Sequence, residues 1–139
     1  MKKLIILITL SLILITGCGS EKIVEIDEKM FITQTDDIYI NQDEYLGQTV
    51  HYEGLFEIYP PEDGFPAQYY VIRRAPGCCG DDGKAGFEIL WDGELPLDND
   101  WVEITGTIQL YSDEGYERLV VKATALTVLP TRGQEFVTQ

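Results

Sequence analysis

The chain has little positive charge. Its 139 residues include only 10 Lys and Arg against 24 Asp and Glu, which gives a formal net charge of −14 at pH 7. Proteins that bind nucleic acid neutralise the phosphate backbone with Lys and Arg, and a strongly acidic chain repels phosphate instead. The composition therefore predicts that nucleic acid is not a partner. It leaves cations, basic partners or simple solubility as the reason for the charge.

The parts that most catalytic sites require are also scarce. The chain has one histidine, His51, and contains no phosphate-binding loop, no nucleophile-elbow motif and no HExxH helix. Hydrolases and phosphoryl-transfer enzymes need these parts at defined spacings. Carboxylates are abundant, but they are abundant throughout the sequence and mark no particular site. We therefore predict that the protein is not an enzyme.

The only long hydrophobic run lies at the N-terminus. Two lysines precede an almost wholly apolar stretch at residues 4–15, which is shorter than the roughly 20 residues that a membrane-spanning helix needs. Residues 14–18, which end in Gly17 and Cys18, resemble the lipobox of bacterial lipoproteins. This resemblance implies a signal peptide at residues 1–17 and a diacylglycerol on the sulfur of Cys18. A lipid there would anchor the protein at the extracytoplasmic face of the cell membrane.

From residue 47 onward, Gly, Pro and Asp interrupt short runs of β-branched and aromatic residues, a pattern typical of strands separated by turns. Gly54 and Gly106 stand where strongly coiled strands bend. A small all-β chain hides its strand edges by closing into a partly open barrel. The sequence therefore predicts an all-β fold, a small five-stranded OB-like barrel at residues 47–130. The five predicted strands are residues 48–59, 68–74, 87–91, 101–111 and 118–129.

The segments around and within the barrel are assigned from composition. Residues 18–27 are predicted to hold the lipidated cysteine and a polar tether. Residues 28–46 are predicted as an N-terminal extension that packs on the barrel, with a short extended piece or partial helix and with Asn41 as the cap of a helical turn. Residues 75–86 are rich in Gly and Asp and predict a loop, and residues 131–139 predict a C-terminal tail.

That loop contains the feature that packing explains least, the adjacent cysteines Cys78 and Cys79 followed by Asp81 and Asp82. Three interpretations remain open. The thiols form a strained vicinal disulfide, or they bind a soft or borderline metal such as zinc or copper(I), or they sit in a tight turn with neither role. A metal needs more than two ligands, and Asp81, Asp82 and the more distant His51 are the candidates to supply them.

Arg73 and Arg74 come shortly before the cysteines. Successive strand residues point to opposite faces, so one of the two arginines is expected on the side of a thiol. A positive charge there lowers the pKa of a cysteine and favours the thiolate. Pairing with one of the many carboxylates is the alternative role for each arginine.

Several short segments within residues 37–107 form a recognisable set: residues 38–41, 45–47, 53–54, 91–93 and 100–107 and the double cysteine with Asp81 or Asp82. With these segments, residues 37–107 resemble the C-terminal domain of an uncharacterised bacterial family. Members of that family are two-helix membrane proteins found beside predicted permeases, and their C-terminal domain is thought to be OB-like. The resemblance therefore implies an OB-like domain and a permease as partner. This chain differs from the family in its predicted lipid anchor, which stands in place of transmembrane helices.

Taken together, these patterns predict a membrane-anchored extracytoplasmic binding module. Its Cys78-Cys79 loop is expected to bind a transition metal, zinc or copper, and the protein is expected to act with a permease. Two alternatives remain. One is a thiol-disulfide redox lipoprotein that uses the same cysteine pair, and the other is a structural or protein-interaction lipoprotein without metal.

Overall fold

The computed structural model describes residues 22–113 and 115–139 of the chain. The predicted signal peptide and Cys18 therefore lie outside the described residues. None of the helices in the described part is long and apolar enough to cross a membrane. The elements are β1 (Ile23–Glu25), the 3-10 helix η1 (Glu28–Met30), α1 (Phe31–Ile40), α2 (Gln42–Tyr45), β2 (Thr49–Tyr59), β3 (Gln68–Gly77), β4 (Gly80–Leu90), β5 (Trp101–Asp113) and β6 (Tyr116–Val128).

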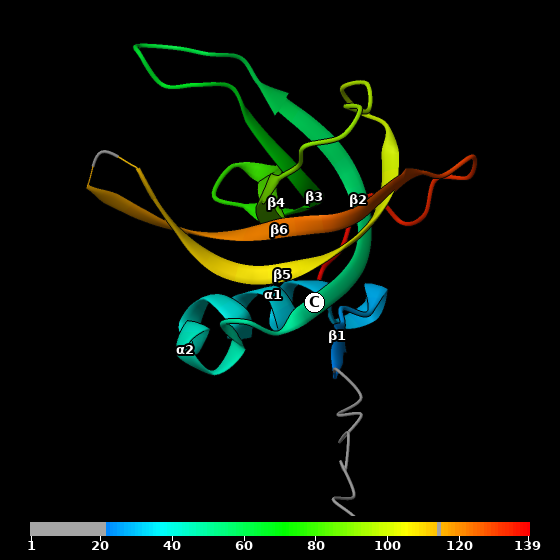
Figure 1. Ribbon diagram of the computed structural model, residues 1–139. Helices are drawn as coiled ribbons and strands as arrows, with labels where there is room; N and C mark the ends of the chain where they lie inside the picture. The colour runs from blue at the N-terminus through cyan, green and yellow to red at the C-terminus, as the bar shows by residue number, and fades with distance from the viewer. Residues whose placement is uncertain (1–21, 114) are drawn as a thin grey trace, which may run out of the picture.

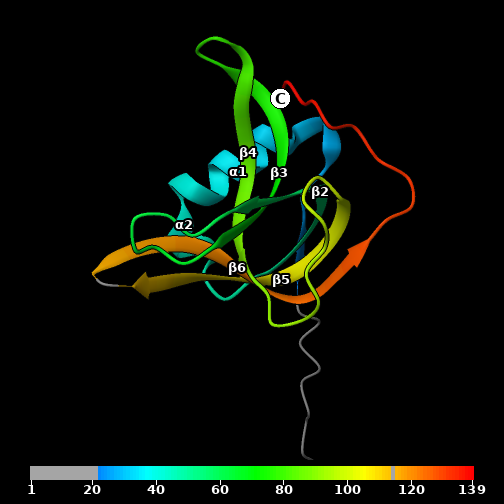
Figure 2. The same cartoon turned by 90° about the horizontal axis from the view of Figure 1, so that it is seen from above.

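The strands form one mixed six-stranded sheet in the order β1-β2-β3-β4-β6-β5, and β2 also pairs with β5. Residues 49–55 of β2 pair with β5, whereas residues 55–59 pair with β3, so the sheet curls back on itself (Figures 1 and 2). The β1–β2 and β4–β6 pairs are parallel and the others are antiparallel. The predicted all-β, five-stranded OB-like barrel is confirmed as β2 to β6. β1 is an additional edge strand.

Two glycines allow the strands to cross closely where the sheet bends. Gly54 pairs with Val102 and Gly106 with Val50, at the two ends of the β2–β5 ladder. A Cβ atom on Gly54 would lie 2.6 Å from the carbonyl oxygen of Ile72, and one on Gly106 would lie 2.6 Å from that of Lys122. Both distances are shorter than any ordinary contact. The sequence-based assignment of these glycines to bends is therefore confirmed in steric terms.

The core fills the inside of the barrel and continues onto α1. Alternate residues of β2 point inward, so that Val50, Tyr52 and Phe56 are fully or almost fully buried. Helix α1 lies against one end of the barrel (Figure 1) and buries Phe31 and Ile38 there. The ring of Phe31 meets that of Tyr52 edge to face, with centroids 5.8 Å apart. The helix thus closes the barrel end that the barrel strands alone leave open.

The N-terminal segments are more regular than their composition suggests. β1 lies inside the stretch predicted as tether, and its residues 23–25 pair with residues 49–51 of β2. The predicted partial helix is a full ten-residue helix, α1. Asn41 makes no side-chain cap on α2. Its amide instead donates to the Asp37 carboxylate at 2.7 Å, because Asn41 directly follows α1 and closes the end of that helix.

The Gly- and Asp-rich stretch at residues 75–86 is a β-hairpin and not the predicted loop. β3 and β4 pair from Tyr69↔Ile89 out to Gly77↔Gly80, with a bulge between Ala75 and Gly77. The C-terminal tail lies against β3. The Arg74 amide donates to the Glu135 carbonyl, and the Val137 amide donates to the Arg74 carbonyl. Val137 is 1% exposed, so the tail is part of the packed domain.

Candidate metal centre

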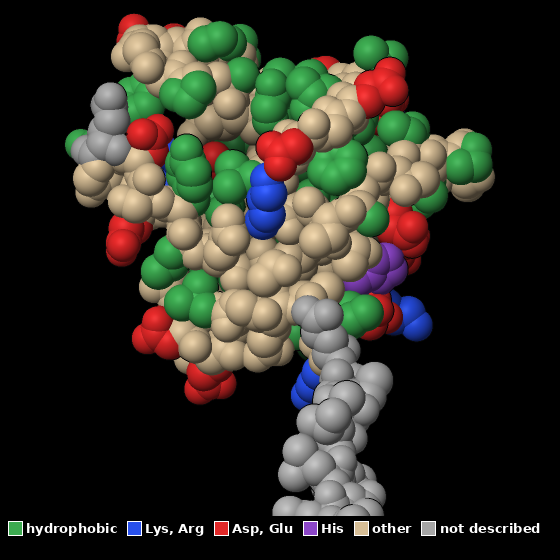
Figure 3. All heavy atoms as spheres, in the orientation of Figure 1, with side chains coloured by type: hydrophobic (Ala, Val, Ile, Leu, Met, Phe, Trp, Pro, Cys, Tyr) green, Lys and Arg blue, Asp and Glu red, His purple; other side chains and the backbone are tan. Residues whose placement is uncertain are grey.

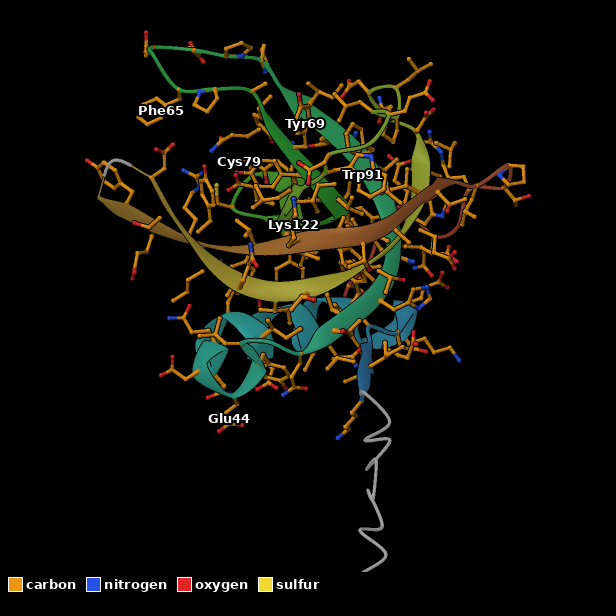
Figure 4. All side chains as sticks on the ribbon, in the orientation of Figure 1. Glu44, Phe65, Tyr69, Cys79, Trp91 and Lys122 are labelled. Carbon is orange, nitrogen blue, oxygen red and sulfur yellow. The ribbon has the colours of Figure 1, made fainter. Side chains whose placement is uncertain are left out.

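The cysteines occupy the tip of the β3–β4 hairpin. Gly77 pairs with Gly80, so Cys78 and Cys79 form a two-residue turn between the last paired residues. Gly80 has a φ of +103°, a conformation that side chains other than glycine rarely adopt. Both cysteines are exposed, and both are free thiols. Figure 4 labels Cys79 at this turn. The local sequence therefore folds so that two adjacent thiols stand at an exposed end of the sheet.

Three potential ligand atoms converge at this tip. The Sγ atoms of Cys78 and Cys79 are 3.5 Å apart. Together with a carboxylate oxygen of Asp82 they form a group in which every ligand atom lies within 4.8 Å of the others. No further group of three or more His, Cys, Asp or Glu side chains with this geometry occurs within residues 22–113 and 115–139. Asp81 follows Gly80 on β4, but its side chain lies outside the described part, so its predicted role is not tested.

The position of the Asp82 carboxylate depends on glycine at position 77. A Cβ atom on Gly77 would lie 1.9 Å from Oδ1 of Asp82. Asp82 therefore folds back over the turn into space that any other residue at 77 would fill. The Cys79 amide donates to the same oxygen at 3.3 Å, which holds the carboxylate near the thiols.

His51, the other predicted ligand, does not belong to this group. It lies on β2, where Nδ1 is 2.5 Å from Glu25 of β1 and Nε2 is 3.1 Å from Glu103 of β5. Burial, the largest single influence, lowers the pKa of His51. The hydrogen bonds to the two glutamates outweigh it and raise the pKa above its usual value. The histidine therefore joins three strands of the sheet and leaves the cysteine tip without a histidine ligand.

The two arginines before the cysteines do not reach the thiols either. Arg73 is buried, with its guanidinium 5.0 Å from the ring centroids of both Phe31 and Trp101. Arg74 Nε donates to Glu135 at 2.7 Å. The hydrogen bonds from Arg74 and Arg132 lower the pKa of Glu135 below its usual range. Arg73 therefore packs between aromatic rings and pairs with Glu28, and Arg74 pairs with Glu135. Neither contact supports the interpretation in which one of these arginines lowers the pKa of a cysteine.

A groove that the sequence did not predict lies between the β2–β3 loop and the β5–β6 hairpin. It has a volume of about 520 Å³ and is lined by aromatic, proline and acidic residues, among them Tyr59, Phe65 and Tyr116. The composition of residues 60–66 predicts a turn-rich connecting loop. Phe65, an aromatic residue among turn formers, was the one feature of that sequence that could have indicated a binding surface.

Comparison with known proteins places the chain in a family. No curated protein and no solved structure matches it. The model of the DUF1980 C-terminal domain matches residues 15–137, a span that covers the whole barrel, the cysteine hairpin and most of the tail. The chain belongs to the DUF1980 C-terminal domain family.

Proposed function

We propose that the tip of the β3–β4 hairpin binds a soft or borderline transition-metal cation, zinc or copper(I), and that the protein is a membrane-anchored extracytoplasmic binding module. The observation that carries this proposal is the convergence of Cys78 Sγ, Cys79 Sγ and an Asp82 oxygen within 4.8 Å. Thiolate ligands select these ions over hard cations such as magnesium or calcium.

The spacing of the two sulfurs suits a single ion. A tetrahedral zinc with zinc–sulfur bonds of about 2.3 Å holds two thiolates roughly 3.8 Å apart. The two Sγ atoms lie at 3.5 Å, so a small rotation of the side chains is enough to reach that spacing. The carboxylate of Asp82 would be the third, oxygen ligand.

Three protein ligands leave a fourth position open. Structural zinc sites are closed by four protein ligands, whereas sites that exchange a ligand keep one position free. Because Cys78 and Cys79 are exposed, a donor or acceptor protein has access to the ion from outside the barrel. These features suit a module that receives and passes on a cation, and a permease in the same membrane is the partner we propose for it.

The location is proposed from the N-terminal sequence. The run at residues 4–15 followed by Gly17 and Cys18 supports export and lipidation at Cys18. β1 begins at Ile23, so only a short stretch of sequence separates Cys18 from the first strand. A Cys18→Ser variant is expected to leave the membrane fraction and to lose the mass of the lipid. If the variant stays in the membrane fraction to the same extent as wild type, the proposed lipid anchor at Cys18 is wrong.

A non-enzymatic role is part of the proposal. A thiol nucleophile needs an adjacent base, and in the described part of the chain the one histidine is held between Glu25 and Glu103. The acidic chain also disfavours nucleic acid as a partner. On the face shown in Figure 3, acidic side chains are spread widely and basic ones appear at few places.

The test is metal binding by the full-length protein in a non-ionic detergent. Native mass spectrometry and thiol counting are carried out with and without equimolar zinc, and with copper(I) under reducing conditions. Cys78→Ser and Asp82→Asn are compared with Asp43→Asn, which removes an exposed carboxylate on α2. We expect one metal per chain, protection of both thiols, and loss of both effects in Cys78→Ser. Asp82→Asn should bind more weakly, and Asp43→Asn should behave as wild type.

Other outcomes separate the alternatives. If the protein binds no metal and its mass is two hydrogens lower until a reductant is added, the cysteines form a reversible disulfide. That result would favour a thiol-disulfide redox protein over the proposed metal-binding module. If both thiols stay reactive and respond neither to metal nor to oxidant, the remaining alternative is a structural or protein-interaction lipoprotein. Zinc binding that survives the loss of both cysteines would place the metal elsewhere and also contradict the proposal.

A further inference from the structure

The groove between the β2–β3 loop and the β5–β6 hairpin has the form of a binding surface. Both loops project to the left in Figure 1 and in Figure 2, and Figure 2 shows them apart from the tip of the β3–β4 hairpin. The groove holds about 520 Å³. Its lining residues are Tyr59, Pro60, Glu62, Asp63, Phe65, Pro66, Gln68, Asp113, Tyr116, Glu117 and Arg118. It is therefore separate from the candidate metal centre and needs its own explanation.

Large apolar side chains in this groove face solvent. Phe65 is 53% exposed and Tyr116 is 68% exposed, one on each side of the groove. Figure 4 shows Phe65 on the side of its loop that faces the β5–β6 hairpin, and Figure 3 shows hydrophobic side chains gathered over the β2–β3 loop. Two prolines stiffen the same wall. Exposed apolar residues grouped around a hollow mark interaction sites far more often than the same residues scattered singly.

The charge in the groove is negative and unpaired. The carboxylates of Glu62, Asp63 and Glu117 form no ion pair with any described residue. The one basic side chain, Arg118, is already neutralised, because its Nε and Nη2 donate to the two oxygens of Glu88 at 2.8 and 3.1 Å. A ligand that enters this groove therefore meets free negative charge beside aromatic rings, a combination that favours Lys or Arg side chains.

One wall of the groove is also an unpaired strand edge. β6 pairs with β5 along its whole length, but its other side pairs with β4 only at residues 120–122. In the described part of the sheet, residues 116–119 have no strand on that side, and three of them line the groove. An extended peptide can add to such an edge by main-chain hydrogen bonds while its alternate side chains enter the adjacent hollow.

From the charge, the aromatic walls and the strand edge together, we propose that this groove binds an extended segment of a partner protein that carries Lys or Arg. Backbone pairing with residues 116–119 would give the segment its direction. Tyr116 and Phe65 would pack on the aliphatic stems and hold the cationic heads over their rings. One face of the Tyr59 ring is already taken by Lys84, whose Nζ lies 5.2 Å from the ring centroid, so Tyr59 contributes mainly as a wall.

The test measures binding of a fluorescent peptide of alternating lysine and valine to the full-length protein in a non-ionic detergent, by anisotropy. A peptide with glutamate in place of lysine is the control ligand, and a chelator is present throughout. The measurement is therefore independent of the proposed metal site. Tyr116→Ala and Glu117→Gln are the groove variants. Leu97→Ala and Glu44→Gln are matched exposed changes elsewhere, on the β4–β5 loop and on α2.

We expect the lysine peptide to bind, the glutamate peptide not to bind, and affinity to fall as salt rises. Tyr116→Ala should weaken binding about five- to tenfold. Glu117→Gln should weaken it less, and both control variants should bind as wild type. The proposal is wrong if the lysine peptide does not bind, if both peptides bind equally, or if Glu44→Gln weakens binding as much as Glu117→Gln. The last result would assign the effect to the overall acidic charge.

Discussion

Removing the buried guanidinium of Arg73 should destabilise the barrel severely without touching the metal site. Arg73 is 3% exposed. Its Nε donates to the Glu53 carbonyl at 2.9 Å, and its Nη1 donates to the Gln134 carbonyl at 3.0 Å and to Glu28 at 3.2 Å. These partners belong to β2, the C-terminal tail and η1. One side chain therefore joins three segments that are far apart in the sequence.

The expected loss follows from these contacts. Arg73→Ala leaves two carbonyl oxygens without their charged donor and removes the side chain that separates the rings of Phe31 and Trp101. Truncating one partner in a buried charged network typically costs about 3–5 kcal/mol. Domains of this size have only about 5–15 kcal/mol of stability in total. The urea midpoint should fall by roughly 2 M.

Urea unfolding followed by tryptophan fluorescence measures this loss, because buried Trp101 lies beside the guanidinium. The matched control is Arg74→Ala, since the neighbouring arginine is 40% exposed and pairs with Glu135 at the surface. Exposed ion pairs contribute about 0–1 kcal/mol, so this variant should stay close to wild type. Equal stability losses in the two variants would refute the structural role assigned to Arg73. So would loss of zinc binding in a folded Arg73→Ala protein.

Three further predictions test other parts of the structure. The pKa of His51 is raised, so its pairing with Glu25 and Glu103 stabilises the fold fully below about pH 6.5 and the effect fades as the pH rises through the folded-state pKa. His51→Gln should therefore be less stable than wild type by up to about 1 kcal/mol at pH 6 and nearly equal to it at pH 9. A difference that does not change with pH in urea unfolding would contradict this. Gly54→Ala should cost about 1–3 kcal/mol, because its Cβ meets the Ile72 carbonyl at 2.6 Å, whereas the exposed strand variant Thr127→Ala should cost little. Zinc at about 100 times its Kd should stabilise wild type by about 2.7 kcal/mol in thermal unfolding and leave Cys78→Ser unchanged; equal shifts in both would show binding elsewhere.

The barrel strands were predictable because local chemistry specifies them. In β2, Val50 and Tyr52 alternate with the polar residues His51 and Glu53, and this period of two is the direct signature of a strand with one buried face. Gly54 and Gly106 were predictable as bends for a similar reason, since only glycine allows backbones to approach so closely. These features depend mainly on residues that are close to one another in the sequence.

Helix α1 and the outer half of the hairpin were harder to predict. Phe31, Thr35 and Ile38 follow helical spacing and are all buried, but the polar stretch between the two apolar clusters obscured the pattern. The first half of β4 contains Gly80, Gly83 and Gly86, and glycine-rich sequence normally indicates a loop. It is a strand here because pairing with β3 outweighs its weak intrinsic preference.

The candidate site was predictable only in its local part. Cys78, Cys79 and Asp82 lie within five residues, so a single turn brings them together. The place of His51 depends on long-range register, because it pairs with Thr105 in the β2–β5 ladder and with Glu25 across the β1–β2 ladder. The inward direction of Arg73 likewise depends on which face of β3 meets α1. Alternation along a strand predicts that the side chains of two neighbouring residues point to opposite faces of the sheet, but it does not predict which of the two faces the core.

The tail lies against the outer half of the β3–β4 hairpin, a few residues before the cysteine tip. It holds β3 there, since the backbone of Arg74 bonds to both Glu135 and Val137 and its side chain pairs with Glu135 as well. The two-residue turn beyond this contact is exposed. A site on a rigid strand pair keeps its ligands in position, and exposure at the turn lets another protein approach the ion. Tail truncation before Glu135 should therefore weaken zinc binding even though no ligand is removed, because the part of β3 next to the turn then loses the contacts that hold it in place.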